Sequence, residues 1–149
     1  MFSTEKLVPI AVGSLFAVFC AVTFSSARPQ PKPAAEKNKI ERGRYLVRQV
    51  GLCGDCHTPF NEKGQPIEEK ALQGARIMFK PTVPMPKWGE NAPPIAGLPG
   101  FTDEQAITFL TTGKNVSGQF ASPPMPPFRF NKSDAAAVVA YLRSLKSGQ

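Results

Sequence analysis

Residues 53–57 of this 149-residue chain have the sequence CGDCH and contain two of its three cysteines and its single histidine. Cysteines at this spacing occur in thiol–disulfide pairs, in zinc sites and at attachment points for c-type haem. A structural zinc site usually needs four ligands, whereas the remaining cysteine, Cys20, lies in an apolar N-terminal segment. A thioredoxin-type pair is expected beside alternating strands and helices, which this sequence does not predict.

Haem attachment gives the same spacing a chemical reason. Thiols three residues apart reach the two vinyl groups on neighbouring pyrrole rings and form thioethers, and the histidine that follows lies under the iron. A disulfide between these cysteines would close a very small loop and add little stability. We therefore expect Cys53 and Cys56 to bind one haem c covalently and His57 to ligate its iron.

The second axial ligand must be sought elsewhere, because His57 is the only histidine. Met1 lies in the N-terminal segment, and Met78 lies in the apolar stretch ARIMF, which favours a core position. Met85 and Met125 are both flanked by prolines, which restrict the backbone and remove a hydrogen-bond donor. The residues alone leave both methionines as candidates, together with another weak ligand or an open sixth position.

The N-terminal residues 1–27 are typical of a signal peptide or an uncleaved membrane anchor. Eighteen residues, 7–24, carry no charge, and small residues ending at Ala27 suit signal peptidase. We expect the rest of the chain on the periplasmic side, anchored to the inner membrane if this helix is retained. Residues 28–39 contain three prolines and predict an extended linker, so that the folded domain covers residues 40–149.

Hydrophobic spacing predicts a mostly α domain with about three helices. The first covers about residues 39–50 and places four residues on one face: Gly43, Leu46, Val47 and Val50. The second follows a capping box formed by Thr102 and Gln105 and ends at Gly113. The third, residues 133–148, has an apolar stripe and is capped by Asn131 or Ser133. The 16 prolines and 12 glycines predict long loops between these helices.

Three stretches of the sequence together resemble a class I c-type cytochrome: ERGRYLVRQVGLCGDCHTP, PPMPPF and SDAAAVVAYLRSLK, within residues 40–147. The resemblance implies a cytochrome c-like fold in which the last helix crosses the first, with Gly43 allowing close approach near Tyr141. It also implies that Cys53 and Cys56 bind the haem, that His57 is the proximal ligand and that Met125 is the distal ligand.

The segment GRYLV followed by GLCGDCHTP is similar to the cytochrome subunits of membrane-associated periplasmic dehydrogenases. Those subunits usually carry three haem motifs, whereas this chain has one.

An iron with protein ligands on both faces has no open position, so the expected function is one-electron transfer without a substrate site of its own. The alternatives are a fixed haem subunit of a membrane oxidoreductase and a five-coordinate haem for gas binding or peroxide chemistry. The net charge of +7 predicts redox partners with acidic docking surfaces. No nucleic-acid-binding module is recognised. Six aromatic residues are expected around the haem: Phe60, Trp88, Phe101, Phe109, Phe128 and Phe130.

Overall fold

The computed structural model describes residues 33–145 of the chain, and the predicted signal or anchor segment lies outside them. The expectation of a mostly α fold is confirmed. Four α-helices occur between residues 33 and 145, and the strands there are two residues long. Among these residues, no helix is both long and apolar enough to cross a bilayer.

Helix α1 (Pro33–Tyr45) begins about six residues earlier than the sequence predicted. Residues 33–39 were expected to be extended linker, and this expectation was wrong. Pro33 is the last of the three prolines and occupies the first helical position, where its missing N–H removes no intrahelical hydrogen bond. The alanines, Glu36 and Lys37 that follow are good helix formers, so helix propensity prevails over the preceding prolines.

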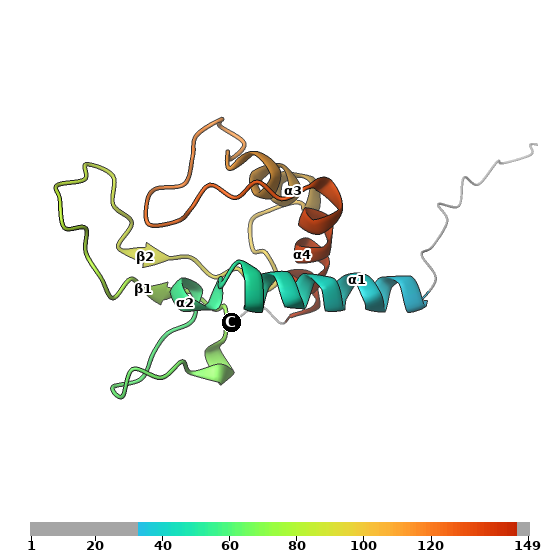
Figure 1. Cartoon of the computed structure of the whole chain (residues 1–149), viewed down its shortest axis with the longest axis horizontal. Coiled ribbons are helices and arrows are strands. Elements are labelled where there is room, and N and C mark those ends of the chain that lie inside the picture. The colour runs from blue at the N-terminus through green and yellow to red at the C-terminus, as the bar shows by residue number, and fades with distance from the viewer. Residues whose placement is uncertain (1–32, 146–149) are drawn as a thin grey trace, which may run out of the picture. The chain divides into compact units, whose positions relative to one another are not determined.

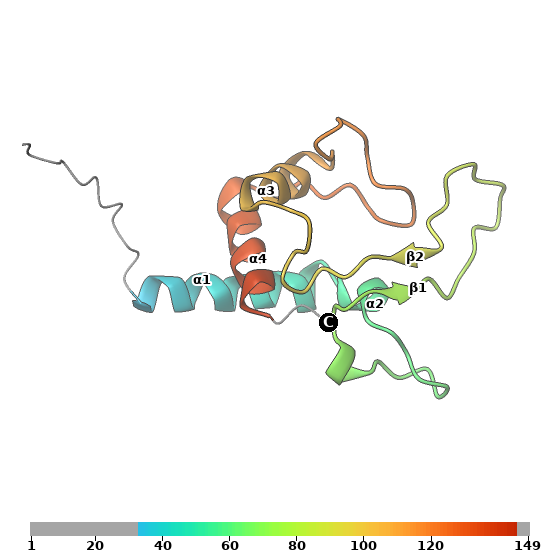
Figure 2. The ribbon, with the colours of Figure 1, turned by 180° about the vertical axis from the view of Figure 1, so that it is seen from behind.

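Helix α4 (Lys132–Ser144) crosses α1, as Figures 1 and 2 show from opposite sides. The crossing is close at Gly43, where an added Cβ would clash with the carbonyl oxygen of Ala137 and lie 2.8 Å from the Cβ of Tyr141. Arg42 binds Asp134 through two hydrogen bonds, at 2.9 and 3.1 Å, and so ties α1 to the start of α4. The interhelical contact implied by the family resemblance is therefore present.

The end of the first helix is a π-helical turn, η1 (Leu46–Val50). The amide of Gly51 donates to the carbonyl of Leu46 at 2.7 Å, five residues back instead of four. This wider turn moves Val50 off the buried face that the sequence predicted for it, and its side chain is exposed. Leu46 and Val47 remain buried as expected.

Helix α3 (Asp103–Thr112) begins and ends where the sequence signals predicted. Thr102 and Gln105 form the reciprocal capping box, and Gly113 closes the helix in the left-handed conformation at φ 73°. Asn131, one of the two predicted caps, accepts a hydrogen bond from the amide of Asp134 at the start of α4. These caps satisfy backbone donors that the helix itself leaves unpaired.

The chain between η1 and α3 is mostly loop. It contains the short helix α2 (Gly54–His57), the 3-10 turn η2 (Glu68–Lys70), and an antiparallel pair formed by β1 (Ala75–Arg76) and β2 (Asn91–Ala92). The loop between β1 and β2 projects beyond the helices (Figure 1).

Two hydrogen bonds fix the loop that follows α2. The side-chain oxygen of Thr58, which is buried, accepts from the amide of Leu72 at 3.0 Å. The amide of Gly74 donates to the carbonyl of His57 at 2.8 Å. Residues 57 and 58 are thereby held against the segment that leads into β1.

The hydrophobic core lies between α1, η1, α3, α4 and the loop segments around residues 72 and 96. Its buried members are Leu46, Val47, Leu72, Ala96, Leu98, Ala106, Ala137, Val138, Val139, Tyr141 and Leu142. Ala137 is among them, at the close approach of α4 to Gly43.

Replacing Gly43 by alanine tests the helix crossing. Glycine to alanine in an open helical position stabilises a protein by about 1 kcal/mol, whereas overpacking a tight site costs about 1–3 kcal/mol. The clash with Ala137 predicts that G43A lowers the free energy of unfolding, measured by chemical denaturation of the haem-loaded protein. Asn38→Ala, at an exposed position of α1, is the control and should not destabilise. A G43A protein more stable than wild type would contradict the close crossing.

A second prediction concerns the loop after α2. Thr58→Val leaves the buried amide of Leu72 without its acceptor, which costs about 1–3 kcal/mol of folding free energy. Thr58→Ser restores the hydroxyl and should recover most of the loss. Equal stability of the valine and serine variants in urea titrations would show that this hydrogen bond contributes nothing.

Candidate functional site

The CGDCH motif lies at α2, where Cys53 is the residue before the helix and His57 is its last residue. Cys53, Cys56 and His57 line one cavity of about 600 Å³, and Met125 lines the same cavity from the other end of the sequence. The structure therefore brings together all four residues that the sequence and the resemblance named. This volume lies within the range of about 300–1,000 Å³ that is typical of ligand pockets.

The ring of His57 is held in one orientation. The side chain is 5% exposed, and its Nδ1 lies 2.7 Å from the carbonyl oxygen of Pro93. Burial lowers the pKa of His57, and the hydrogen bond to Pro93 opposes this shift. Because a carbonyl only accepts, the neutral ring donates from Nδ1 and keeps its lone pair on Nε2. A histidine that binds a metal usually donates its other ring N–H in this way.

Both cysteines of the motif are free thiols with raised pKa values. Burial raises the pKa of Cys53 to about 11 and also raises the pKa of Cys56. The thiolate is the nucleophile in disulfide exchange, and pKa values are lowered at thiol redox sites. The environment here has the opposite effect. Within residues 33–145, no group of three or more His, Cys, Asp or Glu side chains is placed to hold a metal ion.

The walls of the cavity are mainly apolar and come from segments far apart in the sequence. They include Ile95 and Leu98 from the loop before α3, Leu110 from α3, and Val138 and Leu142 from α4. An apolar cavity with two thiols at one side, a histidine lone pair and a thioether fits a haem group. Such walls would keep water away from the iron of a bound haem, and solvent exclusion affects the reduction potential of a haem.

The structure separates the two candidate methionine ligands. Met125 is half-buried and lines the cavity, whereas Met85 lies in the loop between β1 and β2, is 40% exposed and does not line it. Met78, which the apolar sequence around it placed in the core, is 78% exposed, so that expectation was wrong. The stretch ARIMF forms β1 and the beginning of a projecting loop instead of a core element.

Three of the six aromatic residues expected around the haem line the cavity: Phe101, Phe109 and Phe128. Phe60 lines a separate shallow pocket, Trp88 packs edge to face on Phe79, and Phe130 stacks on Phe128 at 5.2 Å. The sequence contained no signal that distinguished these two groups, because all of these aromatic residues except Phe109 of α3 lie outside the helices, where no periodic pattern predicts burial.

Two groups that shape the site were not anticipated from sequence. The carbonyl of Pro93, 36 residues from His57, orients the histidine ring. Arg143 of α4 donates to the carbonyls of Gly97, Leu98 and Phe101 at 2.6, 3.2 and 2.5 Å. It thus fixes a loop that forms part of the cavity wall. Backbone carbonyls carry no residue-type signal, so no sequence pattern marks these partners.

Comparison with known proteins places the chain among cytochromes. Residues 40–146 match the Cytochrome c family. The chain is 27% identical to the fructose dehydrogenase cytochrome subunit of Gluconobacter japonicus, over 98% of this chain and 31% of that protein. It is 31% identical to the cytochrome c subunit of the quinone alcohol dehydrogenase of Gluconacetobacter polyoxogenes, over 77% of this chain and 26% of that subunit.

A third relative is the gluconate 2-dehydrogenase cytochrome c subunit of Pantoea cypripedii, which is 30% identical over 76% of this chain and 28% of that subunit. The chain thus spans about a third or less of the length of these relatives. The family match covers most of the chain and includes the CGDCH motif at the cavity. The chain therefore belongs to the cytochrome c family, and its cofactor is one covalently attached haem c.

Proposed function

We propose that this chain relays single electrons between an exported or membrane-bound donor and an acceptor, through a haem attached at Cys53 and Cys56 with His57 and Met125 as axial ligands. The observation that carries the ligand assignment is that His57 and Met125 line one apolar cavity, whereas Met85 does not. A bound haem would supply one-electron chemistry, because its iron changes between the ferric and ferrous states.

The residues of this chain supply orientation and environment. The carbonyl of Pro93 accepts the Nδ1 proton of His57 and would leave the Nε2 lone pair free to bind a haem iron, and a hydrogen bond at Nδ1 raises the basicity of such a ligand. The thioether of Met125, as second ligand, favours the ferrous form and raises the reduction potential. The apolar walls keep water away, which limits reorganisation when the charge changes.

With both axial positions taken by side chains, the site offers no position for a substrate molecule. We accordingly propose an electron carrier or electron-transfer subunit without a substrate site of its own. The five-coordinate alternative, with gas-binding or peroxide chemistry, requires that neither Met125 nor Met85 ligates the iron, and the position of Met125 at the cavity argues against it.

We propose the redox partners of this chain from the names of its relatives and from its net charge. All three relatives named above are cytochrome subunits of dehydrogenases, which supports a dehydrogenase as electron donor. We place the domain on the periplasmic side, anchored through residues 1–27. A net charge of +7 favours docking on acidic redox partners and disfavours basic ones.

A fixed haem subunit of a membrane oxidoreductase is the second candidate. The names of the relatives favour it, because each is a subunit of a larger enzyme. The two candidates differ in whether this chain stays bound to its partner between electron transfers.

Methionine substitution tests the ligand assignment. Ferric haem ligated by a methionine has a characteristic far-red absorption band. Met125→Ala should lose this band and lower the reduction potential, because the thioether no longer favours the ferrous iron. Met85→Ala is the matched control and should retain both properties. Loss of the band in the Met85 variant alone, or its absence from wild type, would refute the assignment to Met125.

Carbon monoxide tests the closed coordination. The spectrum of the ferrous wild-type protein should stay unchanged on addition of carbon monoxide, since both axial positions are occupied. The ferrous Met125→Ala protein should bind the gas and shift its spectrum. A shift of similar size in wild type would instead support the five-coordinate alternative.

Purification of the full-length chain in mild detergent distinguishes a carrier from a fixed subunit. We expect the chain to elute without a partner in constant ratio, because a tethered carrier binds its partners only transiently. Size-exclusion chromatography with mass spectrometry of the haem-containing fractions provides the measurement. A second protein present in fixed stoichiometry through two columns would establish the fixed-subunit alternative.

A further inference from the structure

Residues 77–89, which form all but the last residue of the loop between β1 and β2, carry exposed apolar side chains. Met78, Phe79, Val83 and Met85 are 78%, 51%, 63% and 40% exposed. Single exposed apolar residues are common, but a cluster of four within eight residues, on a segment that projects from the domain (Figure 1), is typical of an interaction site. Methionine adapts its shape to different partner surfaces.

This loop has a defined conformation. The amide of Ile77 donates to the carbonyl of Glu90 at 2.8 Å and closes its base. Phe79 and Trp88 pack edge to face, with ring centroids 5.8 Å apart. Three prolines at positions 81, 84 and 86 restrict the backbone between them. A preorganised loop loses little conformational entropy when it binds a partner.

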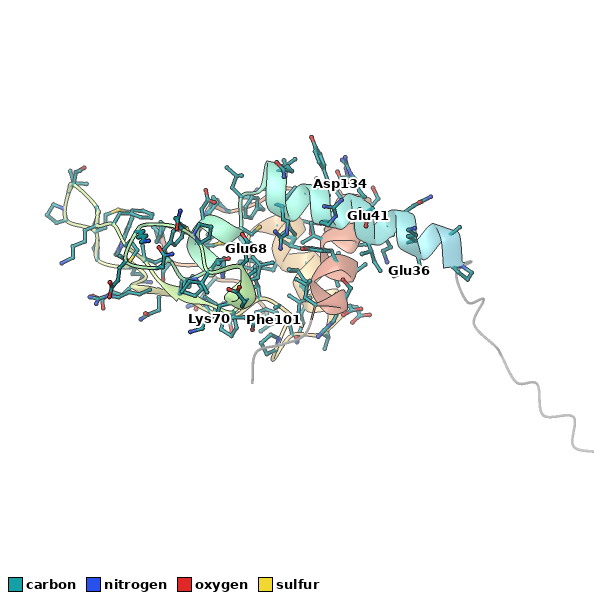
Figure 3. All side chains as sticks on the ribbon, turned by 90° about the horizontal axis from the view of Figure 1, so that it is seen from below. Glu36, Glu41, Glu68, Lys70, Phe101 and Asp134 are labelled. Atoms are coloured by element: carbon teal, nitrogen blue, oxygen red, sulfur yellow. The ribbon has the colours of Figure 1, made fainter. Side chains whose placement is uncertain are left out.

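The outer part of the loop carries positive charge only. Residues 77–89 include Lys80 and Lys87 and contain no aspartate or glutamate, whereas the exposed Glu90 lies at the base of the loop, next to β2. The carboxylates labelled in Figure 3 lie elsewhere, on α1 (Glu36 and Glu41), at η2 (Glu68) and at the start of α4 (Asp134). The loop therefore presents apolar side chains flanked by positive charge, which complements an apolar surface flanked by carboxylates.

The base of the loop forms part of the cavity. Ile77 and Gly89 both line it, and the amide of Gly89 donates to the carbonyl of Pro123 at 2.6 Å. Pro123 precedes Met125 by two residues, so the loop is joined directly to the segment of the proposed ligand. The base of the loop therefore lies beside the proposed haem site.

We propose that the loop of residues 77–89 is the docking surface for a redox protein partner, whose complementary surface is an apolar hollow bordered by carboxylates. This inference rests on the electron-transfer function proposed above, and it adds the site and the surface chemistry of the partner. Apolar contact provides affinity at short range, while Lys80 and Lys87 orient the approach.

A protein partner fits this surface better than a lipid bilayer does. In Figures 1 and 2 the loop lies at the end of the domain opposite the start of α1. A bilayer accepts no electron, whereas the position of the base of the loop beside the cavity suits electron exchange with a protein.

Protein voltammetry of the full-length, haem-loaded chain tests this surface without knowledge of the natural partner. The probe is a gold electrode coated with a mixed monolayer of methyl- and carboxylate-terminated alkanethiols, which imitates an apolar surface with carboxylates. Met78→Ser/Val83→Ser removes apolar contact, and Lys80→Glu/Lys87→Glu reverses the charge. Two control variants carry matched changes elsewhere, Val50→Ser/Val116→Ser at two exposed apolar residues and Lys37→Glu/Lys63→Glu with the same change in net charge.

Wild type and both controls should give a strong surface-confined redox wave. Each loop variant should lower the electroactive coverage about tenfold or more, because two buried side chains or two favourable charges are lost from the contact. Rising ionic strength should weaken the wild-type wave. Equal coverage for loop variants and wild type, or an equal loss in the controls, would overturn the assignment.

Two further measurements distinguish a protein-docking surface from a lipid-binding surface, and a failure of the docking inference from a failure of the electron-transfer function. Co-sedimentation with phosphatidylglycerol vesicles that disappears in Met78→Ser/Val83→Ser, while the voltammetric wave stays unchanged, would overturn the inference in favour of a lipid surface. Redox titration in solution with small mediators tests the proposed function separately. Failure of that titration in wild type refutes electron transfer itself, whereas a normal titration with no loop effect at the electrode refutes only the docking surface.

Discussion

The close approach of α1 and α4 at Gly43 is the contact on which the rest of the structure depends. With no side chain at this position, the backbone of α1 reaches the carbonyl of Ala137 and the side chain of Tyr141. The crossing buries Leu46 and Val47 one turn later, and the motif begins directly after that turn. The position of the CGDCH cysteines relative to α4 thus depends on a single residue without a side chain.

The site itself depends on backbone groups from segments far apart in the sequence. Pro93 provides the acceptor for His57, Leu72 and Gly74 hold the chain that follows the motif, and Arg143 fixes the loop around Leu98. None of these groups is expected to touch the iron. Together they fix the histidine tautomer and the shape of the apolar wall, which are the properties through which a protein tunes a haem.

The same fold leaves one loop with little role in its own packing. Residues 77–89 expose apolar side chains beside lysines, and only the base of the loop contributes to the cavity. An electron carrier must hold its cofactor in a dry interior and still bring it within reach of a partner. Burial of the site by α3, α4 and the loops, together with a preorganised surface next to the methionine segment, satisfies both requirements.

The sequence by itself determined the chemistry of this protein. The CGDCH motif, the single histidine and the helix signals at Thr102, Gly113 and Asn131 depend on residue type and local spacing, and local structure follows them directly. Only the tertiary structure decided the rest. It placed Met125 at the cavity and Met85 outside it, and it exposed Met78. Burial depends on which distant segments meet, and the residues next to each methionine do not record this.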